Sequence, residues 1–310
     1  YQRMYGEHYE KHLYELIQQT ADHFHWDQGK EHWADLKKKG MTSATDAAGG
    51  GHAHCGMMIY LGNNWPKKYR GNLFTLNFHG LRMNQDTLHR KGAGYVGKHA
   101  PDFMKTKDKW FRGIELGYGP DGGVYVLDWS DIGECHENDG IHRTSGRIYK
   151  ITYGKTKPFP QNLNKLSSPE LAKLQTHAND WHVRQARRLM QERAVAGQAD
   201  ITQAQKVLRG IYNKSSSVPH RLRAMWALQV TGSLDEKWLL KQTHDENEHI
   251  RVWAIKLLND SGSPSTTTLK RFVHMAKTDT AGLVQLHLAS PLQVLPHTNR
   301  WELATALVSH

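Results

Sequence analysis

The sequence predicts a chain of two parts, a partial β-propeller followed by an α-solenoid of HEAT- or armadillo-like repeats. In the first part, apolar segments of about four to six residues alternate with Gly, Pro, Asp and Asn, which is typical of short strands joined by tight turns. In the second part, apolar residues recur at helical spacing, and the pattern repeats along the chain. The expected parts are a helix and long loop belonging to the propeller (1–51), propeller blades (52–154), a linker (155–166) and helical repeats (167–310).

Five segments between residues 52 and 154 have the apolar character of strands. They are Met57–Leu61, Leu73–Leu76, Gly113–Leu116, Val124–Asp128 and Arg147–Ile151. Repeated four-stranded units of this kind build propeller blades, and about two blades fit in this length. We therefore expect the earlier blades upstream of Tyr1, in a chain that is a fragment or a processed product.

The N-terminal part carries a weaker pattern. Tyr9, Leu13, Leu16 and Ile17 recur at near-helical spacing and predict a helix within residues 1–28. Residues 29–51 are charged or small and end in three glycines, which predicts a long loop.

The helical part repeats one motif. Trp181–Leu189, Pro219–Leu228 and Glu248–Leu258 each contain an aliphatic residue followed by arginine and then apolar residues at helical spacing, and Leu283–Leu288 is a weaker copy. One such unit cannot bury its own apolar face, so the copies are expected to stack. The arginines are expected to bind neighbouring turns. Ser168–Glu170 predicts a helix start, with a hydroxyl cap and proline at the first helical position.

Composition narrows the function classes. The 310 residues are 38% hydrophobic and 23% charged, as in globular proteins, and no apolar stretch is long enough to span a bilayer. The formal charge is +11, but Lys and Arg are spread along the chain, which favours a solvated basic surface over a nucleic-acid site. We do not expect nucleic acid as a partner.

Two His-x-His pairs predict a metal site. They are His23 with His25, and His52 with His54. On an extended segment, residues two apart point to the same side, and two imidazoles on one side are a common start for a transition-metal site. The alternative is that these histidines make ordinary hydrogen bonds at the edges of the strands.

A second set of candidates lies at strand ends. Arg82 and Arg112 could clamp carboxylates or the acidic groups of a quinone cofactor, and the alternative is a salt bridge between blades. Asp128 and Trp129 begin an acidic loop after a strand, where a hard cation such as Ca²⁺ could bind. The alternative for the loop's acids is turn formation and capping.

The two cysteines, Cys55 and Cys135, form no CxxC or CxxCH motif. A disulfide, two buried thiols and thiolate ligands all stay open. A Cys55–Cys135 disulfide is expected if the protein is exported.

Seven motifs resemble one bacterial family. They are Gly49–Gly56, Ile59–Pro66, Tyr69–Phe74, Trp110–Ile114, Gly119–Val126, Asp128–Asp131 and Gly146–Ile151. Together they are similar to the C-terminal blades of a propeller-type, haem-binding, membrane-bound dehydrogenase family of planctomycete and verrucomicrobial bacteria. The helical repeats after them match the domain order of that family.

The resemblance implies an exported, periplasmic protein carrying the last blades of a six-bladed propeller, distantly similar to quinoprotein sugar dehydrogenases. Arg82 and Arg112 would then lie where those enzymes place cofactor-contacting cations. The first hypothesis is oxidation of a sugar-like alcohol with a quinone or a metal ion (Ca, Cu or Zn), passing electrons to a haem domain outside this chain. The alternative is a non-catalytic scaffold that binds carbohydrate or protein, with the helical repeats as the docking surface. Trp65, Trp110 and Trp129 suit sugar stacking in either case.

Overall fold

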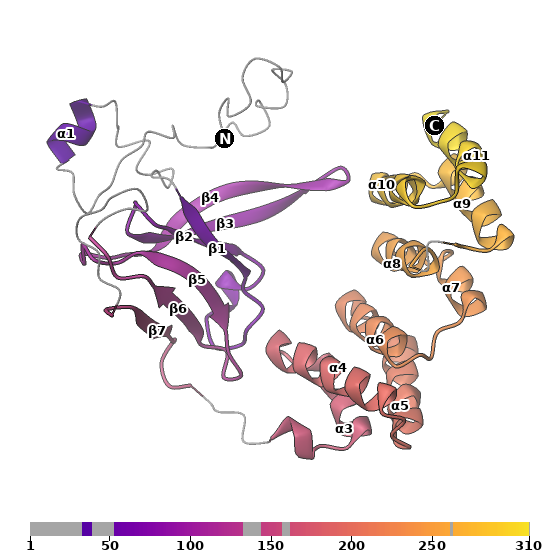
Figure 1. The fold of residues 1–310 in the computed structure, drawn as a ribbon, viewed down its shortest axis with the longest axis horizontal. Coiled ribbons are helices and arrows are strands. Elements are labelled where there is room, and N and C mark those ends of the chain that lie inside the picture. The colour runs from indigo at the N-terminus through magenta and orange to yellow at the C-terminus, as the bar shows by residue number, and fades with distance from the viewer. Residues whose placement is uncertain (1–32, 39–52, 133–143, 157–161, 261–262, 310) are drawn as a thin grey trace. The chain divides into compact units, whose positions relative to one another are not determined.

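A computed structural model describes residues 33–38, 53–132, 144–156, 162–260 and 263–309 (Figure 1). The chain divides into two compact units. The sheet unit comprises residues 1–89 and 97–158, and the helical unit comprises residues 159–310 together with residues 90–96.

The sheet unit contains two antiparallel sheets. The first has four strands in the order β1 (His54–Ile59), β2 (Leu73–Asn77), β3 (Arg82–Lys91) and β4 (Gly94–Lys105). The second has three strands in the order β5 (Gly113–Tyr118), β6 (Val124–Asp128) and β7 (Arg147–Ile151). Strand β5 contacts β1 and β2, so the two sheets share one core.

The prediction of a partial propeller is wrong. The two sheets are open, with four and three strands, and they form no propeller blades. Strand and turn alternation is common to every antiparallel meander, so it does not specify packing around a central channel. The two longest strands were not predicted from the sequence. They are β3 and β4, with 10 and 12 residues, and they lack the apolar pattern of a strand because they are rich in polar side chains. Within the predicted loop 29–51, residues Trp33–Lys38 form helix α1.

An aromatic cluster joins the β1–β2 connection to the β5–β6 turn. The Tyr60 hydroxyl accepts hydrogen bonds from the backbone N–H groups of Asn64 and Trp65 and donates one to the Gly122 carbonyl at 2.8 Å. Gly122 has φ +78°, and a Cβ there would lie 2.6 Å from the Asn64 nitrogen. Trp65 stacks on Tyr60 with ring centroids 4.6 Å apart and is 5% exposed, so it is a core residue and does not offer its ring to a sugar.

The helical unit is an array of paired helices. Its members are α3 (Ser168–Lys173), α4 (Asp180–Val195), α5 (Ile201–Lys214), α6 (Val218–Val230), α7 (Glu236–Gln242), α8 (Glu248–Leu258), α9 (Thr266–Thr278), α10 (Gly282–Ala289) and α11 (Trp301–Val308). Helices α4, α6, α8 and α10 pack in succession and form one row (Figure 1). These four helices contain the four copies of the repeated motif.

Side-chain caps fix where these helices begin. Ser167 and Glu170 form a capping box at α3, one residue before the predicted cap, and Pro169 lies in the first turn. Asn179 and Asn247 cap α4 and α8 by accepting hydrogen bonds from backbone N–H groups. Among the described helices, none combines the length and apolarity needed to cross a bilayer.

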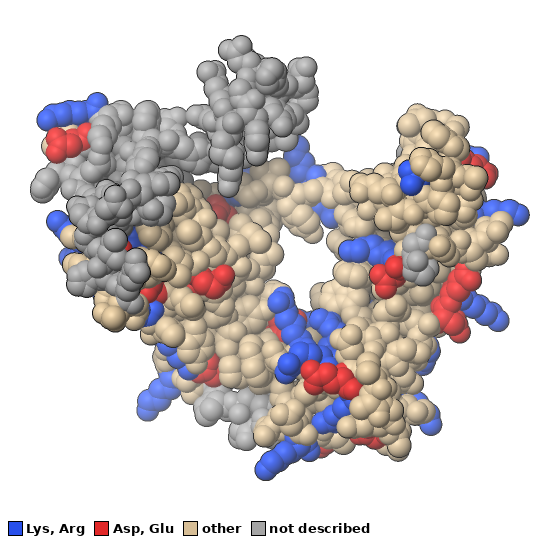
Figure 2. Space-filling view, viewed as in Figure 1, with Lys and Arg blue, Asp and Glu red and all other residues tan. Residues whose placement is uncertain are grey.

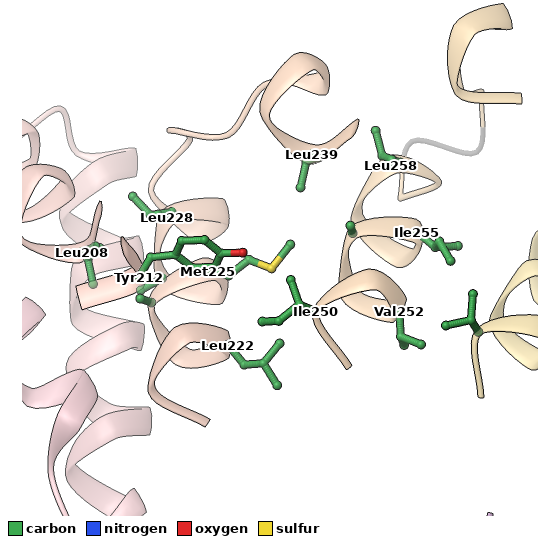
Figure 3. Close-up of a cluster of buried hydrophobic side chains, with 14 of the residues drawn as sticks. Leu208, Tyr212, Leu222, Met225, Leu228, Leu239, Ile250, Val252, Ile255 and Leu258 are labelled. Atoms are coloured by element: carbon green, nitrogen blue, oxygen red, sulfur yellow. The ribbon is translucent and has the colours of Figure 1, made fainter. Parts of the chain in front are cut away.

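The core of the helical unit is continuous and apolar. Figure 3 shows Leu208 and Tyr212 of α5 packed toward Leu222 and Met225 of α6, with Ile250 of α8 next in line. All five are at most 9% exposed. The stacked helices therefore bury the apolar faces that single pairs would expose.

Candidate functional site

The sequence-predicted arginines and Asp128 lie where several strands of the sheet unit end. Because neighbouring strands run antiparallel, the end of β2 and the start of β3 lie together, as do the start of β5, the end of β6 and the start of β7. Arg82 and Arg112 are 0% exposed and Asp128 is 3% exposed. A group of charges is therefore buried at this end of the sheets.

Asp128 binds three segments at once. Its carboxylate accepts hydrogen bonds from the backbone N–H of Arg112 at 2.7 Å and from that of Ser130 at 2.9 Å. It also accepts one from Nε of Arg147, at the start of β7, at 2.7 Å. These bonds join β5, the β6 end and β7, and they satisfy a carboxylate that burial would otherwise destabilise.

Arg147 extends this network to a second carboxylate. Its Nη1 lies 2.6 Å from Oδ2 of Asp108. Burial acts to raise the pKa of Asp108, but hydrogen bonds from the Trp110 N–H and from Arg147 outweigh this effect, and the pKa is lowered. Burial likewise acts to lower the pKa of Arg147, but hydrogen bonds to Asp108 and Asp128 raise it overall. Both groups are therefore held in their charged forms.

The Arg112 guanidinium ties loop backbone together. Nη1 donates to the carbonyls of Lys109 and Phe111 at 3.2 and 3.1 Å, and Nη2 donates to that of Ile132 at 3.1 Å. The guanidinium carbon lies 5.6 Å from the centre of the Phe78 ring. Arg112 thus holds the segments before β5 and after β6 against the β2–β3 turn.

Arg82 pairs with Asp102 of β4. Nη1 of Arg82 lies 2.9 Å from Oδ2 of Asp102, and Nε donates to the Gly80 carbonyl at 3.0 Å. The His99 ring lies 3.5 Å from a carboxylate oxygen of Asp86 and 3.6 Å from one of Asp102. Arg82 and Arg112 therefore both contact the β2–β3 turn, Arg82 through its backbone and Arg112 through Phe78.

Two residues in this region have left-handed backbone. Leu81 has φ +50° and Ser130 has φ +56°, conformations that non-glycine residues adopt rarely. Each lies in a turn bound by the arginine and carboxylate contacts above. Such strain persists only where the surrounding contacts fix it. Here Arg82 binds the Gly80 carbonyl next to Leu81, and Asp128 accepts a hydrogen bond from the N–H of Ser130.

The other site residues predicted from the sequence do not all lie in this buried group of charges. Trp129 follows Asp128 on alternating backbone and is 53% exposed, so it lies on the opposite face, with its indole Nε1 donating to Asp131 at 3.3 Å. His54 is exposed on β1 and pairs in register with Asn77 of β2. His23, His25, His52 and Cys135 lie outside the described residues. Within the described ranges, no group of three His, Cys, Asp or Glu side chains could hold a metal ion.

The geometry shows what the buried group does. Arg82 and Arg112 contact backbone carbonyls, an aromatic ring and a carboxylate of the chain itself. Such contacts hold strand ends and loops in place. The quinone- or metal-binding role of these residues stays a prediction.

A second candidate site, which the sequence reasoning missed, lies on the helical unit. Arg187 of α4, Trp226 of α6, and Trp253 and Lys256 of α8 form a continuous stack of alternating contacts, here named the cation–aromatic strip. A signal was present in the sequence, because a Trp-Ala pair recurs in two copies of the repeat, at Trp226 and at Trp253.

Comparison with known proteins addresses mainly the sheet unit. Residues 4–155 match the model of a domain of unknown function, DUF7133. No curated protein and no solved structure matches the chain. The match ends before α3, so it does not extend to the helical array, and the resemblance to a dehydrogenase family stays a hypothesis.

Proposed function

We propose that this chain is a non-catalytic binding scaffold whose helical unit docks a protein partner. The observation that carries the proposal is the cation–aromatic strip, which crosses three successive helices of one row, α4, α6 and α8. Stacked helical repeats present extended surfaces of this kind for binding.

The strip is preorganised by its own contacts. The Arg187 guanidinium carbon lies 5.2 Å from the centre of the Trp226 ring, and the Trp226 and Trp253 rings are 4.8 Å apart at an angle of 64°. Lys256 Nζ lies 4.3 Å from the Trp253 ring centre. Side chains held in this way lose little conformational entropy when a partner binds, and Trp and Arg are the residue types that dominate binding energies at protein interfaces.

The charges of the strip indicate the chemistry of the partner. Arg187 and Lys256 each face an indole ring, and neither forms an ion pair with a described residue. Burial lowers the pKa of Arg187, an effect that the nearby Asp180 offsets only in part. A carboxylate brought by a partner would stabilise both cations, so the preferred partner is an acidic segment with apolar side chains between its carboxylates.

The surface of the helical unit is not uniformly basic. On the face shown in Figure 2, basic and acidic side chains are interspersed over the helices of the helical unit. Specific contacts, more than net charge, are then expected to select the partner.

The test uses fluorescein-labelled amphipathic peptides and fluorescence anisotropy. Peptides carrying Asp and Glu are compared with analogues carrying Asn and Gln at the same positions. The chain is expected to bind the acidic peptides at least about tenfold more tightly, and Lys256→Glu is expected to remove this preference because Lys256 is exposed and lies at one end of the strip.

Lys206→Glu on α5 is the matched control. Lys206 is exposed, carries the same charge and lies outside the strip, so the charge reversal should leave peptide binding unchanged. Equal losses in the two variants would mean that only net charge matters, and equal binding of acidic and neutral peptides would reject the proposed partner.

A further inference from the structure

A polar cavity of about 400 Å³ lies between two loops of the helical unit. One loop follows α7 and contributes Thr243, His244 and Asp245, and the other follows α9 and contributes Asp279 and Thr280. The remaining lining residues come from α8 and α9, and they are Arg251, Arg271, His274, Met275 and Thr278. The cavity is separate from the cation–aromatic strip in the residues that form it.

The two carboxylates of this cavity already have arginine partners. Asp245 is ion-paired with Arg221 of α6. Asp279 accepts two hydrogen bonds from Arg251, from Nε at 2.7 Å and from Nη2 at 2.9 Å. Their negative charges are therefore matched within the protein.

Arg271 differs from these arginines. Its Nε donates to the Thr243 hydroxyl at 2.8 Å, and its Nη2 donates to the Thr243 carbonyl at 2.9 Å. It forms no ion pair with any of the described residues. Two hydrogen bonds thus fix the guanidinium plane while its charge and its Nη1 donors are left for a ligand.

Two imidazoles add positive charge to this cavity only when they are protonated. His244 and His274 are exposed side chains that line the same cavity. The pKa of His244 is lowered by burial, by the Arg271 charge and by His274. Burial also lowers the pKa of Arg271, and Arg251 adds to this effect while Asp279 opposes it. The positive charge around this cavity is therefore greater than the negative charge of Asp245 and Asp279.

We propose that this cavity binds a tetrahedral oxyanion of the phosphate class, held by the Arg271 guanidinium and flanked by His244 and His274. A planar guanidinium presents paired N–H donors that match two oxygens of such an anion. The imidazoles would contribute further donors and, when protonated, further charge. The site stands independently of the partner proposed for the cation–aromatic strip.

The first experiment titrates the whole chain with sulfate and follows the histidine ring signals by NMR. Sulfate remains a dianion over the pH range used, so any pH dependence comes from the protein. The signals of His244 and His274 are assigned from the spectra of His244→Gln and His274→Gln. We expect saturable shifts of these two rings, with sodium chloride at equal ionic strength as the reference.

Arg271→Gln is expected to weaken sulfate binding by about tenfold or more, since a charged pair of hydrogen bonds is lost. Lys270→Gln is the control, because Lys270 is the exposed neighbour on α9 and does not line the cavity. If Arg271→Gln unfolds the chain, the double variant His244→Gln/His274→Gln decides. It should abolish the rise in sulfate affinity expected as pH falls through the imidazole range.

A second titration separates the sources of the anion. Inorganic phosphate is compared with a phosphoserine peptide and with its unphosphorylated form. Binding of both phosphate forms supports a phosphate site open to either source, and binding of the free anion alone restricts it to small ligands. Absence of shifts in His244 and His274, or equal losses in the Arg271 and Lys270 variants, would overturn the proposal.

Discussion

The sheet unit and the helical unit use arginine in different ways. In the sheet unit, Arg82 and Arg112 are fully buried beside the apolar core. In the helical unit, the largest fully buried side chains are apolar, and arginines such as Arg221 and Arg251 keep some exposure while they bridge neighbouring loops. The sheet core is thus completed by two fully buried arginines, whereas the arginines of the helical unit lie at the edge of an apolar core, where they bridge loops and, in the Arg223–Asp180 pair, two helices.

The largest effect is expected from the apolar core of the helical unit. Phe272 of α9 is 0% exposed, and Phe272→Ala removes a whole ring from the stack. The free energy of unfolding should fall by about 3–5 kcal/mol, measured by urea titration with helical circular dichroism. Val195→Ala, at a position that is 86% exposed, should leave the unfolding midpoint unchanged. A loss below about 1 kcal/mol for Phe272→Ala would mean that this core is not tightly packed.

A similar loss is expected in the sheet unit from a polar change. Asp102→Asn removes the carboxylate that lies 2.9 Å from the fully buried Arg82 guanidinium. Breaking a buried pair from one side should cost about 3 kcal/mol. Hydrogen exchange with mass spectrometry should show lost protection in β2–β4 peptides and none in α5–α8 peptides.

The matched change in the helical unit is Asp245→Asn. Its partner Arg221 has 21% side-chain exposure, so water can solvate the remaining charge. A cost of about 1 kcal/mol is expected. Equal costs for Asp102→Asn and Asp245→Asn would remove the contrast between the two units.

A smaller effect should appear in acid. The pKa of Asp108 is lowered in the folded protein, so the unfolded chain binds more protons as pH falls, and stability is lost below the ordinary carboxyl pKa of about 4. In Asp108→Asn, the sheet unit should be less stable at pH 7 and should lose less stability between pH 5 and pH 3. The loss is limited because the Asp108 side chain is 40% exposed. An unchanged slope of stability against pH would show that the Arg147 pair contributes nothing.

The smallest effect is expected from a surface pair on the helical unit. Arg188 and Glu192 lie one turn apart on α4, at 3.6 Å, and their side chains are 64% and 55% exposed. Glu192→Gln should change the free energy of unfolding by less than about 0.5 kcal/mol, measured by the same urea titration. A loss of more than about 1 kcal/mol would mean that this exposed pair stabilises the fold as much as the partly buried Arg221–Asp245 pair does.

Much of the local structure could be predicted from the sequence. The apolar segments predicted as strands form β1, β2, β5, β6 and β7, and the repeated motif marks α4, α6, α8 and α10. The hairpin of β3 and β4 could not be predicted in this way. Its first strand runs through Asn84, Gln85 and Asp86, and the first two are buried although they are polar.

The candidate sites were predicted less well. The sequence predicted Arg82, Arg112 and Asp128 as site residues, and the structure buries all three. Their network also contains Asp102, Asp108 and Arg147, which the sequence did not predict as partners. Trp129 was assigned to the same site as Asp128, although strand alternation places adjacent residues on opposite faces. That rule was available from the sequence alone.

The sequence by itself determined the local elements, because hydrophobic period, caps and turn residues act between residues close along the chain. Only the tertiary structure decided that the sheets are open, that Arg82 binds Asp102, and that Arg271 has no carboxylate partner among the described residues. It also brought Arg187, Trp226 and Trp253 into one stack. These contacts join residues about 20 to 40 positions apart, and their pairing depends on how the elements pack, which a local pattern does not encode.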